Sequence, residues 1–385
     1  MKSELDNDSA RWRQVLENDE SYSLSAVNGV TLIDESNLLD FPRVLRDSLH
    51  SHLIFETSGS SGVSKWVVHR KSALIKHAQL VNTHLGITMN DVLGLVLPQY
   101  HVGGFGVIAR AITSGSVLAQ YREKWSACAC VEFLTRENVS VLSLVPTQVV
   151  DIVGEELSCP ECVRIAVVGG GQLGSDVRDR AVKLGWNIQE SYGMTETGSQ
   201  IATSIVSEAD DDNGYLPLID GWQVRLGSEG MLEVKGECLF EGYLNDRSKG
   251  RVFTDPKKDG WFTTSDHVDL LEKEGATKLK FLGRRDQQVK ILGELVDVSA
   301  LENRLSGQLK IEAYLIPLPD ERRGARLFPV VDHAENAGLI TRLSWSGLER
   351  LEKPVIITEF PRNEMGKLQR TKLAEAVESI VFSAE

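Results

Sequence analysis

The sequence predicts a protein of the α/β class, and three features of the chain support this. Three short, nearly continuous apolar runs are typical of strands that are buried on both faces of a sheet: 91–98, 140–146 and 163–168. Stretches with helical character separate these runs: 106–112, 126–138, 147–153 and 175–184. After about residue 214, short strands punctuated by glycine indicate a β-rich subdomain. The alternation of strands and helices predicts layered α/β sheets with helices on both faces.

The remaining elements are expected in the following order. The first 50 residues form a small opening segment, with a helix starting at residues 11–16 and a strand at 29–33. A strand, a polar loop and a second strand then occupy residues 53–69. The next helix is predicted from Ser72 to Leu85, with Ser72 as its N-cap. From Gln287 onward strands and helices mix again, with helices expected at 298–305 and 373–380.

Composition and charge limit the classes of function. A chain of 385 residues suggests two or three domains. The net charge of −13 argues against a nucleic-acid or anionic-membrane surface, so local cations must hold any anionic ligand. No secretory signal or membrane-spanning run is visible, which favours a cytoplasmic protein without membrane insertion. The cysteines at 128, 130, 159 and 162 suggest zinc or a redox pair, but the odd total of five cysteines fits reduced, buried thiols better.

The polar loop between the first two predicted strands carries five hydroxyl side chains before its terminal lysine. Its candidate residues are Thr57, Ser58, Gly59, Ser60, Ser61, Gly62 and Lys65. Backbone N–H groups, hydroxyls and a lysine can together hold a phosphate, and glycine lets the backbone approach closely. A flexible Ser/Gly loop is the alternative interpretation. The loop differs from a Walker A loop because no Ser or Thr follows Lys65 at a helix start.

A second glycine-rich turn, from Gly169 to Gly174, matches the G-x-G-x-x-G pattern between a strand and a helix. Glu190 ends the next predicted strand, near the position of a ribose-binding acid. The turn therefore supports a rival class, an NAD-binding oxidoreductase. The run that follows, Glu190-Ser-Tyr-Gly-Met-Thr-Glu196, argues against that class.

Together with the Ser/Gly loop, this run resembles the adenylate-forming (AMP-binding) superfamily of acyl-CoA ligases, firefly luciferase and peptide-synthetase adenylation domains. Four more motifs follow in the family's order: Gly242-Tyr-Leu-Asn245, Gly260-Trp-Phe-Thr-Thr-Ser-Asp266, Gly283-Arg-Arg-Asp-Gln-Gln-Val-Lys290 and Pro361 to Arg370. The resemblance covers residues 53–373. It implies a large ATP- and acyl-binding domain at 1–285 and a small, mobile α+β domain at 286–385. It also implies an enzyme that uses ATP and Mg²⁺ to convert a small carboxylic acid to an acyl-adenylate, and then CoA to form a thioester.

The resemblance further implies roles for individual residues. Lys367 bridges the acid and the α-phosphate, Thr195 contacts that phosphate, and Glu196 binds Mg²⁺, while His101 orients the carboxylate or controls access to it. The remaining ATP- and AMP-binding residues are Gly169, Gly170, Gly171, Tyr192, Gly193, Asp266 and Arg284. Asp286 is the expected hinge between the domains, and Gly293 lies in the loop that serves CoA. A non-catalytic homologue is a further alternative.

Residues 97–104 and 143–148 are similar to the 2-succinylbenzoate–CoA ligases of menaquinone biosynthesis in particular. The second carboxylate of that acid requires a cation or several donors, for which Arg110 and Gln148 are candidates. Another small aryl- or acyl-CoA ligase is the alternative. The chain departs from the family at Ser64, Ser265 and Gln287, without loss of a charge that the chemistry needs. Its phosphate loop begins at residue 57, so we expect much of the first subdomain to be missing or minimal.

Overall fold

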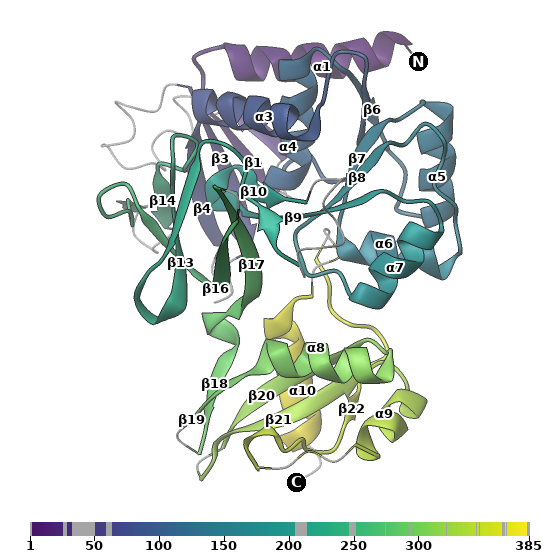
Figure 1. The fold of residues 1–385 in the computed structure, drawn as a ribbon, viewed down its shortest axis with the longest axis vertical. Coiled ribbons are helices and arrows are strands. Elements are labelled where there is room, and N and C mark those ends of the chain that lie inside the picture. The colour runs from purple at the N-terminus through teal and green to yellow at the C-terminus, as the bar shows by residue number, and fades with distance from the viewer. Residues whose placement is uncertain are drawn as a thin grey trace.

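The computed structural model describes residues 2–25, 29–32, 51–58, 64–204, 214–245, 252–273, 275–292, 294–320, 322–343, 345, 347–363, 366 and 368–382. These residues form a large upper part and a smaller lower part in Figure 1, with the helix α1 at the top and the C-terminal elements at the bottom. Within the described residues, no helix has both the length and the apolar character needed to cross a membrane.

The first sheet brings together the N-terminal strands and a hairpin from much later in the chain. Its strand order is β15-β14-β4-β3-β1-β2. The bounds are β1 Tyr22–Ser25, β2 Gly29–Leu32, β3 His52–Ser58, β4 Ser64–Arg70, β14 Gly242–Asn245 and β15 Val252–Thr254. Strands β3 and β4 pair in antiparallel fashion with Thr57 opposite Lys65, which confirms the predicted strand–loop–strand unit. Strand β14 pairs with β4 on its other side and places Asn245 opposite Lys65.

The second sheet is the parallel sheet that the apolar runs predict, in the order β10-β9-β8-β7-β5-β6. All its pairings are parallel except that of β9 with β10. Its strands are β5 Val92–Leu95, β6 Val117–Gln120, β7 Val141–Leu144, β8 Ile165–Val168, β9 Ile188–Met194 and β10 Ser199–Thr203. The accompanying helices are α1 Lys2–Glu17, α3 Lys71–Leu85, α4 Val102–Ser114, α5 Ala127–Arg136, α6 Pro146–Gly154 and α7 Ser175–Lys183.

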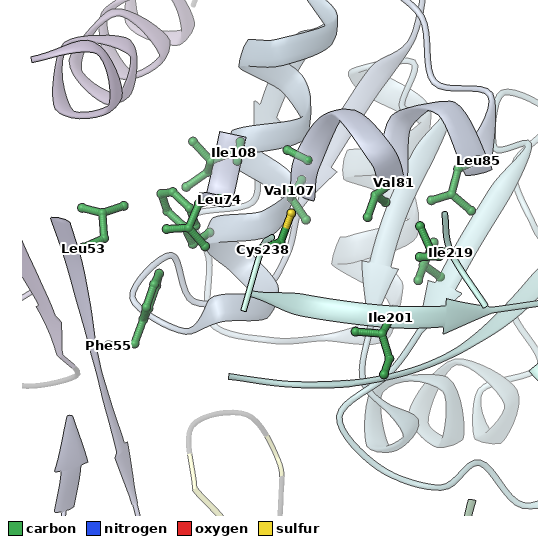
Figure 2. Packing of buried hydrophobic residues seen from close by; sticks show 14 of the residues in the cluster. Leu53, Phe55, Leu74, Val81, Leu85, Val107, Ile108, Ile201, Ile219 and Cys238 are labelled. Carbon is green, nitrogen blue, oxygen red and sulfur yellow. The ribbon is translucent and has the colours of Figure 1, made fainter. Parts of the chain in front are cut away.

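Alternate side chains of this sheet enter two separate cores. Val141, Ile165 and Val167 pack with residues of α1, α3 and α4. Leu142 and Val168 pack on the opposite face with residues of α5, α6 and α7. Figure 2 shows part of the first core, where Leu74, Val81 and Leu85 of α3 lie near Val107 and Ile108 of α4. Burial on both faces explains why these strands are apolar at successive positions rather than at every second one.

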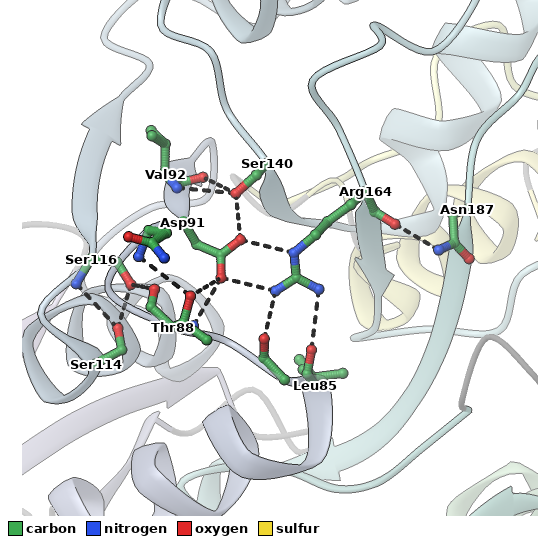
Figure 3. A network of polar contacts seen from close by, with 11 residues as sticks. Leu85, Thr88, Asp91, Val92, Ser114, Ser116, Ser140, Arg164 and Asn187 are labelled. Carbon is green, nitrogen blue, oxygen red and sulfur yellow. Dashed lines mark hydrogen bonds and ion pairs between the residues drawn. The ribbon is translucent and has the colours of Figure 1, made fainter.

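A polar network connects the strands of this sheet at the edge where β5, β7 and β8 begin (Figure 3). Arg164, just before β8, makes two hydrogen bonds to the carboxylate of Asp91, from Nε to Oδ1 at 2.8 Å and from Nη2 to Oδ2 at 3.0 Å. Arg164 also donates to the carbonyl oxygens of Leu85 and Gly86, at the end of α3. The Arg164 guanidinium and the hydrogen bond from Ser140 hold the pKa of Asp91 near 2, against the upward effect of burial. This network fixes the amino-terminal edge of the sheet.

The predicted β-rich part forms an antiparallel sheet in the order β11-β17-β16-β13-β12. Its strands are β11 Leu216–Pro217, β12 Trp222–Leu226, β13 Met231–Gly236, β16 Phe262–Lys273 and β17 Ala276–Arg284. Strands β16 and β17 form a long hairpin that places Asp266 opposite Arg284. The chain then turns through a short 3-10 helix, Arg285–Gln287, into the lower part of the molecule.

The C-terminal part has its own cores, on the two faces of a sheet ordered β20-β21-β22. Leu315 and Leu327 pack with residues of α8 and α9 on one face, while Ile316 and Phe328 pack with Leu373 of α10 on the other. The bounds are β18 Gln288–Ile291, β19 Glu294–Asp297, α8 Val298–Leu309, β20 Ala313–Asp320, β21 Gly324–Val331, α9 Ala334–Thr341, β22 Val355–Ile356 and α10 Arg370–Phe382. The sheets and helices confirm the predicted fold class.

Some local predictions differ from the structure. Helix α3 begins at Lys71, with Arg70 at the N-cap position and no side-chain cap, so the prediction of Ser72 as the cap is wrong. The cause is Lys71, which is buried and donates from Nζ to the carbonyl oxygen and Oδ1 of Asn18, so strand β4 runs directly into the helix. All five cysteines are free thiols, as predicted, but Cys128 is exposed rather than buried. Burial raises the pKa of Cys130 to about 12.

Candidate active site

The predicted site residues gather where the strands of the parallel sheet end at their carboxyl edge. His101 follows β5, the turn from Gly169 to Gly171 follows β8, and Thr195 and Glu196 follow β9. The carboxyl edge of an open parallel sheet is where α/β proteins bind their ligands, because the loops there point away from the packed helices. The long β16–β17 hairpin and strand β14 bring further side chains to this edge from later in the chain.

Three residues that the sequence assigned to the nucleotide meet in the structure. The hydroxyl of Tyr192 donates to Oδ2 of Asp266 at 2.6 Å, and Arg284 Nε lies 3.5 Å from Oδ1 of the same carboxylate. Burial and the neighbouring Asp266 charge raise the pKa of Tyr192 well above its ordinary value, so the phenol stays a donor. The Tyr192 ring stacks on Phe281, with centroids 5.8 Å apart. An acidic, hydrogen-bonding surface of this kind suits the hydroxyls of a sugar.

A second cluster joins three segments that are far apart in sequence. Tyr243 of β14 donates its hydroxyl to Oε1 of Glu196 at 2.7 Å. Lys65, at the end of the polar loop, places its Nζ 5.5 Å from the centroid of the Tyr243 ring. Burial and the Glu196 charge raise the pKa of Tyr243, which keeps its hydroxyl protonated. A cation, a phenol and a carboxylate therefore lie together beside the polar loop.

Two glycines are required by close contacts at this edge. A Cβ atom at Gly193 would lie 2.0 Å from the carbonyl oxygen of Ser199, inside the tight β9–β10 hairpin. A Cβ atom at Gly169 would lie 2.5 Å from Oγ of Ser191. Gly170 adopts the left-handed region, with φ of 80°. The glycine turn is therefore packed directly against the strand that carries Tyr192.

The C-terminal part of the molecule reaches this edge at Gly366. A Cβ atom at Gly366 would lie 2.3 Å from Oγ1 of Thr147, at the start of α6. Asn303 of α8 donates to Oε1 of Gln172 in the glycine turn at 2.9 Å. Arg362 donates from Nη1 to the carbonyl oxygen of Gly366 at 2.8 Å, which fixes this turn to its own domain. Gly366, next in sequence to Lys367, therefore lies against the start of α6.

The other predicted residues are placed as follows. The His101 ring lies against Tyr100, with centroids 4.8 Å apart, and burial lowers its pKa. Within the described part of the chain, His101 has no hydrogen bond from its ring to another predicted site residue. Thr57 donates its hydroxyl to the carbonyl oxygen of Lys65 at 3.1 Å. Residues outside the described part are Gly59, Ser60, Ser61, Gly62, Gly293 and Lys367, together with the side chains of Ser58 and Asp286.

Sequence reasoning missed Tyr243, although it lies in a recognised motif, because nothing in the motif shows that strand β14 pairs with β4. It also gave Glu190 a place in the NAD-binding alternative. In the structure Glu190 Oε1 forms an ion pair with Nε of Arg178 on α7, at 3.1 Å. This carboxylate therefore ties β9 to α7, a structural role that needs no ribose.

The donors present fit a magnesium ion that is held mainly by its nucleotide. In the described ranges, no three His, Cys, Asp or Glu side chains gather closely enough to form a metal site by themselves. Mg²⁺ commonly binds one or two protein carboxylates together with substrate phosphates. Glu196 is the carboxylate that would bind this ion, and Tyr243 donates to its Oε1. An anchored single carboxylate is the arrangement that this chemistry needs.

These features define a nucleotide-dependent enzyme of the adenylate-forming class. A sequence model of the AMP-binding enzyme family matches residues 4–244, and the chain belongs to this family. This match and the relatives confirm the predicted class of activity, an AMP-forming acid–CoA ligase, and favour it over an oxidoreductase. The 2-succinylbenzoate–CoA ligase of Bacillus subtilis is 26% identical over 336 residues, which are 83% of this chain and 68% of that protein. The ligase of the same name from Salmonella typhimurium is 27% identical over 327 residues, with the same two coverages.

Solved structures agree on the fold. The o-succinylbenzoate CoA synthetase from Bacillus subtilis, in complex with the acyl-adenylate intermediate, has a TM-score of 0.71 and 23% identity over 83% of this chain and 68% of its own. The same enzyme in complex with ATP and a magnesium ion has a TM-score of 0.71 and 24% identity, over 83% and 69%. At these identities the likeness establishes the fold.

Proposed function

We propose that this acid–CoA ligase acts on 2-succinylbenzoate and forms 2-succinylbenzoyl-CoA in menaquinone biosynthesis. The names of the curated relatives support this assignment. The structural observation that carries it is Arg110, a buried guanidinium that hydrogen-bonds only neutral groups in the described part of the chain. A cytoplasmic location belongs to the same proposal.

Arg110 lies in the middle of α4 with 4% of its surface exposed. Its Nε donates to the carbonyl oxygen of Gly106 at 3.1 Å, its Nη2 to Oγ of Ser143 at 2.8 Å, and its Nη1 to Oε1 of Gln200 at 3.3 Å. Burial lowers its pKa to about 10, so the side chain is charged at neutral pH. A buried charge is costly without a partner of opposite charge. The second carboxylate of a diacid supplies that partner.

Gln148, the other candidate for binding the second carboxylate, forms a hydrogen bond with the protein backbone. Its Oε1 accepts a hydrogen bond from the backbone N–H of Val145 at 3.0 Å and so caps helix α6. Because a neutral amide cannot supply the positive charge that a second carboxylate requires, Arg110 is the better candidate for the acid.

The proposed reaction has two steps. A carboxylate oxygen of the acid attacks the α-phosphorus of ATP, the bond to the bridging oxygen breaks, and pyrophosphate leaves with both electrons of that bond. The CoA thiolate then attacks the acyl carbon, and AMP leaves as the thioester forms. In the first step two anions approach each other, so fixed cations must stabilise the transition state. Lys367 has this role at the α-phosphate, and Lys65 with the polar loop holds the β- and γ-phosphates.

The remaining site residues bind and orient the nucleotide. Asp266 accepts hydrogen bonds from the ribose hydroxyls, with Arg284 beside it, and the glycine turn at 169–171 borders the adenine. Thr195 and Glu196 hold the α-phosphate and Mg²⁺, which neutralises phosphate charge when bound. His101 orients the carboxylate of the acid.

The C-terminal domain completes the proposal. It begins at residue 286, with Asp286 as the hinge, and its rotation exchanges Lys367 for the loop at Gly293 when CoA reacts. The contact between Gly366 and Thr147 supports the assignment of the present orientation to adenylation.

A panel of acids with ATP and CoA tests the function. Pyrophosphate release and thioester formation are measured for 2-succinylbenzoate, for 4-oxo-4-phenylbutanoate, which lacks one carboxylate, and for simple benzoates and fatty acids. The proposal expects the highest kcat/KM with 2-succinylbenzoate. Turnover of several other acids with none of this diacid would replace the proposal with a small aryl- or acyl-CoA ligase of different specificity.

A further inference from the structure

Three histidines border the β9–β10 hairpin, and the ring of each forms a hydrogen bond with a backbone carbonyl oxygen of the hairpin. His69 of β4 lies with Nε2 2.7 Å from the oxygen of Thr195. His77 and His84 are seven positions apart on α3, about two helical turns. Their Nε2 atoms lie 2.7 Å from the oxygen of Gln200 and 3.0 Å from that of Thr203. Because a carbonyl oxygen only accepts, each Nε2 carries the donated proton.

Two of these histidines are fixed donors in the core. His69 is fully buried and His77 is 4% exposed. Burial lowers the pKa of His69 to about 3 and that of His77 to about 4, so both rings are neutral at physiological pH. Nδ1 of His69 is buried and has no hydrogen-bond partner, which suits a neutral ring and would penalise a protonated one. These two rings hold the hairpin through one directed N–H each.

The hairpin that they hold joins the two halves of the proposed substrate site. At one end, Thr195 is followed by Glu196, which Tyr243 anchors. At the other end, the Gln200 side chain accepts from Arg110 through Oε1 and donates through Nε2 to Oγ1 of Thr203 at 2.7 Å. His69 therefore contacts the backbone of Thr195, a proposed nucleotide-binding residue. His77 contacts the backbone of Gln200, whose side chain accepts a hydrogen bond from the buried Arg110.

Both histidine rings lie beside the turn of the hairpin, at Gly198. A Cβ atom at Gly198, in the turn between β9 and β10, would lie 3.8 Å from Cγ of His77 and 3.9 Å from Cε1 of His69. The ring of His77 also makes an edge contact with Trp222, with centroids 6.2 Å apart. Ile201 of β10 belongs to the same apolar cluster as Leu74 and Val81 of α3, and Figure 2 shows these three residues. A donor held this closely sets the position of the carbonyl that it binds.

We propose that His69 and His77 are positioning residues for two different substrates. His69 sets Thr195 and Glu196 for the nucleotide and its metal, and His77 sets Gln200, and through it Arg110, for the acid. The second half of this inference rests on the proposed acid substrate, whereas the first half requires only nucleotide binding.

The test compares His69→Leu with His77→Leu, and uses His84→Leu as the matched control. Leucine keeps an apolar side chain in place but removes the N–H, which leaves a carbonyl oxygen without its donor. We expect His69→Leu to weaken the binding of Mg-ATP about tenfold and to raise the half-saturating Mg²⁺ concentration, with the KM for the acid changed less than about threefold. We expect His77→Leu to raise the KM for the acid about tenfold and to leave Mg-ATP binding nearly unchanged. His84→Leu should change neither quantity beyond about threefold.

Calorimetric titration with Mg-ATP alone measures the nucleotide half without turnover and without any acid. If His69→Leu weakens Mg-ATP binding as expected while the wild type has no activity on 2-succinylbenzoate, the acid assignment is disproved and the role of His69 is left intact. His69→Gln and His77→Gln keep an N–H at the end of the side chain and should restore most of the lost affinity. Equal losses for both substrates in both variants, or no rescue by glutamine, would mean that the histidines only stabilise the fold.

A measurement on the unmodified protein covers the case in which the leucine variants do not fold. In NMR spectra of protein with ¹⁵N-labelled histidine, Mg-ATP should shift the Nε2–H signal of His69, and the acid should shift that of His77. Assignment uses the glutamine variants. Shifts of both signals with either ligand, or with neither, would contradict the division of roles.

Discussion

Replacing Arg110 with methionine tests the proposed contact between its guanidinium and the second carboxylate of the acid. Methionine fills much of the same volume but removes the charge and the hydrogen bonds to Gly106, Ser143 and Gln200. Because Arg110 forms no ion pair within the described residues, its removal leaves no orphaned carboxylate. We therefore expect the substitution to lower the free energy of unfolding by at most about 2 kcal/mol.

The effect on catalysis should be larger and should depend on the acid. A hydrogen bond to a charged group contributes about 1.5–3 kcal/mol, so loss of the guanidinium from a bound carboxylate costs about 3 kcal/mol in total. Each factor of ten corresponds to about 1.4 kcal/mol, which predicts a fall of about 100-fold in kcat/KM for 2-succinylbenzoate. The acid 4-oxo-4-phenylbutanoate has no second carboxylate, so its kcat/KM should change less than about threefold.

The assay is pyrophosphate release at saturating Mg-ATP for both acids, with the wild type and three variants. Arg110→Lys keeps a charge but loses the forked geometry, and it should lie between the wild type and Arg110→Met. Arg136→Met removes an exposed arginine on α5 that pairs with Glu137, and it serves as the control. If Arg110→Met slows both acids equally, or slows neither, the guanidinium does not bind the second carboxylate and the reasoning fails.

Four further outcomes are expected. Lys367→Ala should slow adenylation at least about 100-fold while Mg-ATP still binds in a calorimetric titration, and an unchanged rate would exclude the proposed role. Lys65→Ala should slow pyrophosphate release but spare thioester formation from preformed acyl-adenylate, so equal losses in the two half-reactions would contradict its assignment to the departing phosphates. Tyr243→Phe removes the hydrogen bond to Glu196 and should raise the half-saturating Mg²⁺ concentration about tenfold, measured with and without acid; an unchanged value would separate Glu196 from the metal. Burial, together with the nearby Arg110 charge, lowers the pKa of His77 in the folded protein to about 4, against 6.5 for the free side chain. Below about pH 6.5 the unfolded chain therefore binds a proton at this residue that the folded chain does not, and the free energy of unfolding falls as the pH falls. Urea unfolding should show this residue's contribution as a loss of about 2 kcal/mol between about pH 8 and pH 5, which His77→Gln abolishes.

Local sequence patterns predicted the elements of the fold well where one property dominated. The apolar runs of the parallel strands were recognised because both faces of β7 and β8 are buried, in two different cores. Prediction was weaker where a distant residue decided the local structure. The start of α3 depends on the bond from Lys71 to Asn18, which is 53 positions away, and no local pattern around Ser72 contains that information.

The candidate site also contains residues that the motifs indicated and residues that only the tertiary structure brings together. Motif resemblance proposed Glu196, Asp266 and Arg284 as site residues, but it assigned no role to Tyr243 or to the histidines that contact the β9–β10 hairpin. Tyr243 lies 47 positions after Glu196, and only the pairing of β14 with β4 brings its hydroxyl to that carboxylate. Glu190, which the turn motif placed near a ribose, is instead paired with Arg178.

By itself, the sequence determined the α/β class, the order of the motifs and the kinds of side chain that the chemistry uses. These follow from periodicity and from short segments whose residues act together. The tertiary structure decided which of those side chains meet and in what electrostatic state. Arg110 shows the difference, because only the structure places its guanidinium in the core among the neutral acceptors Gly106, Ser143 and Gln200. Burial and long-range strand pairing are properties of the folded chain, and no local pattern of residues specifies them.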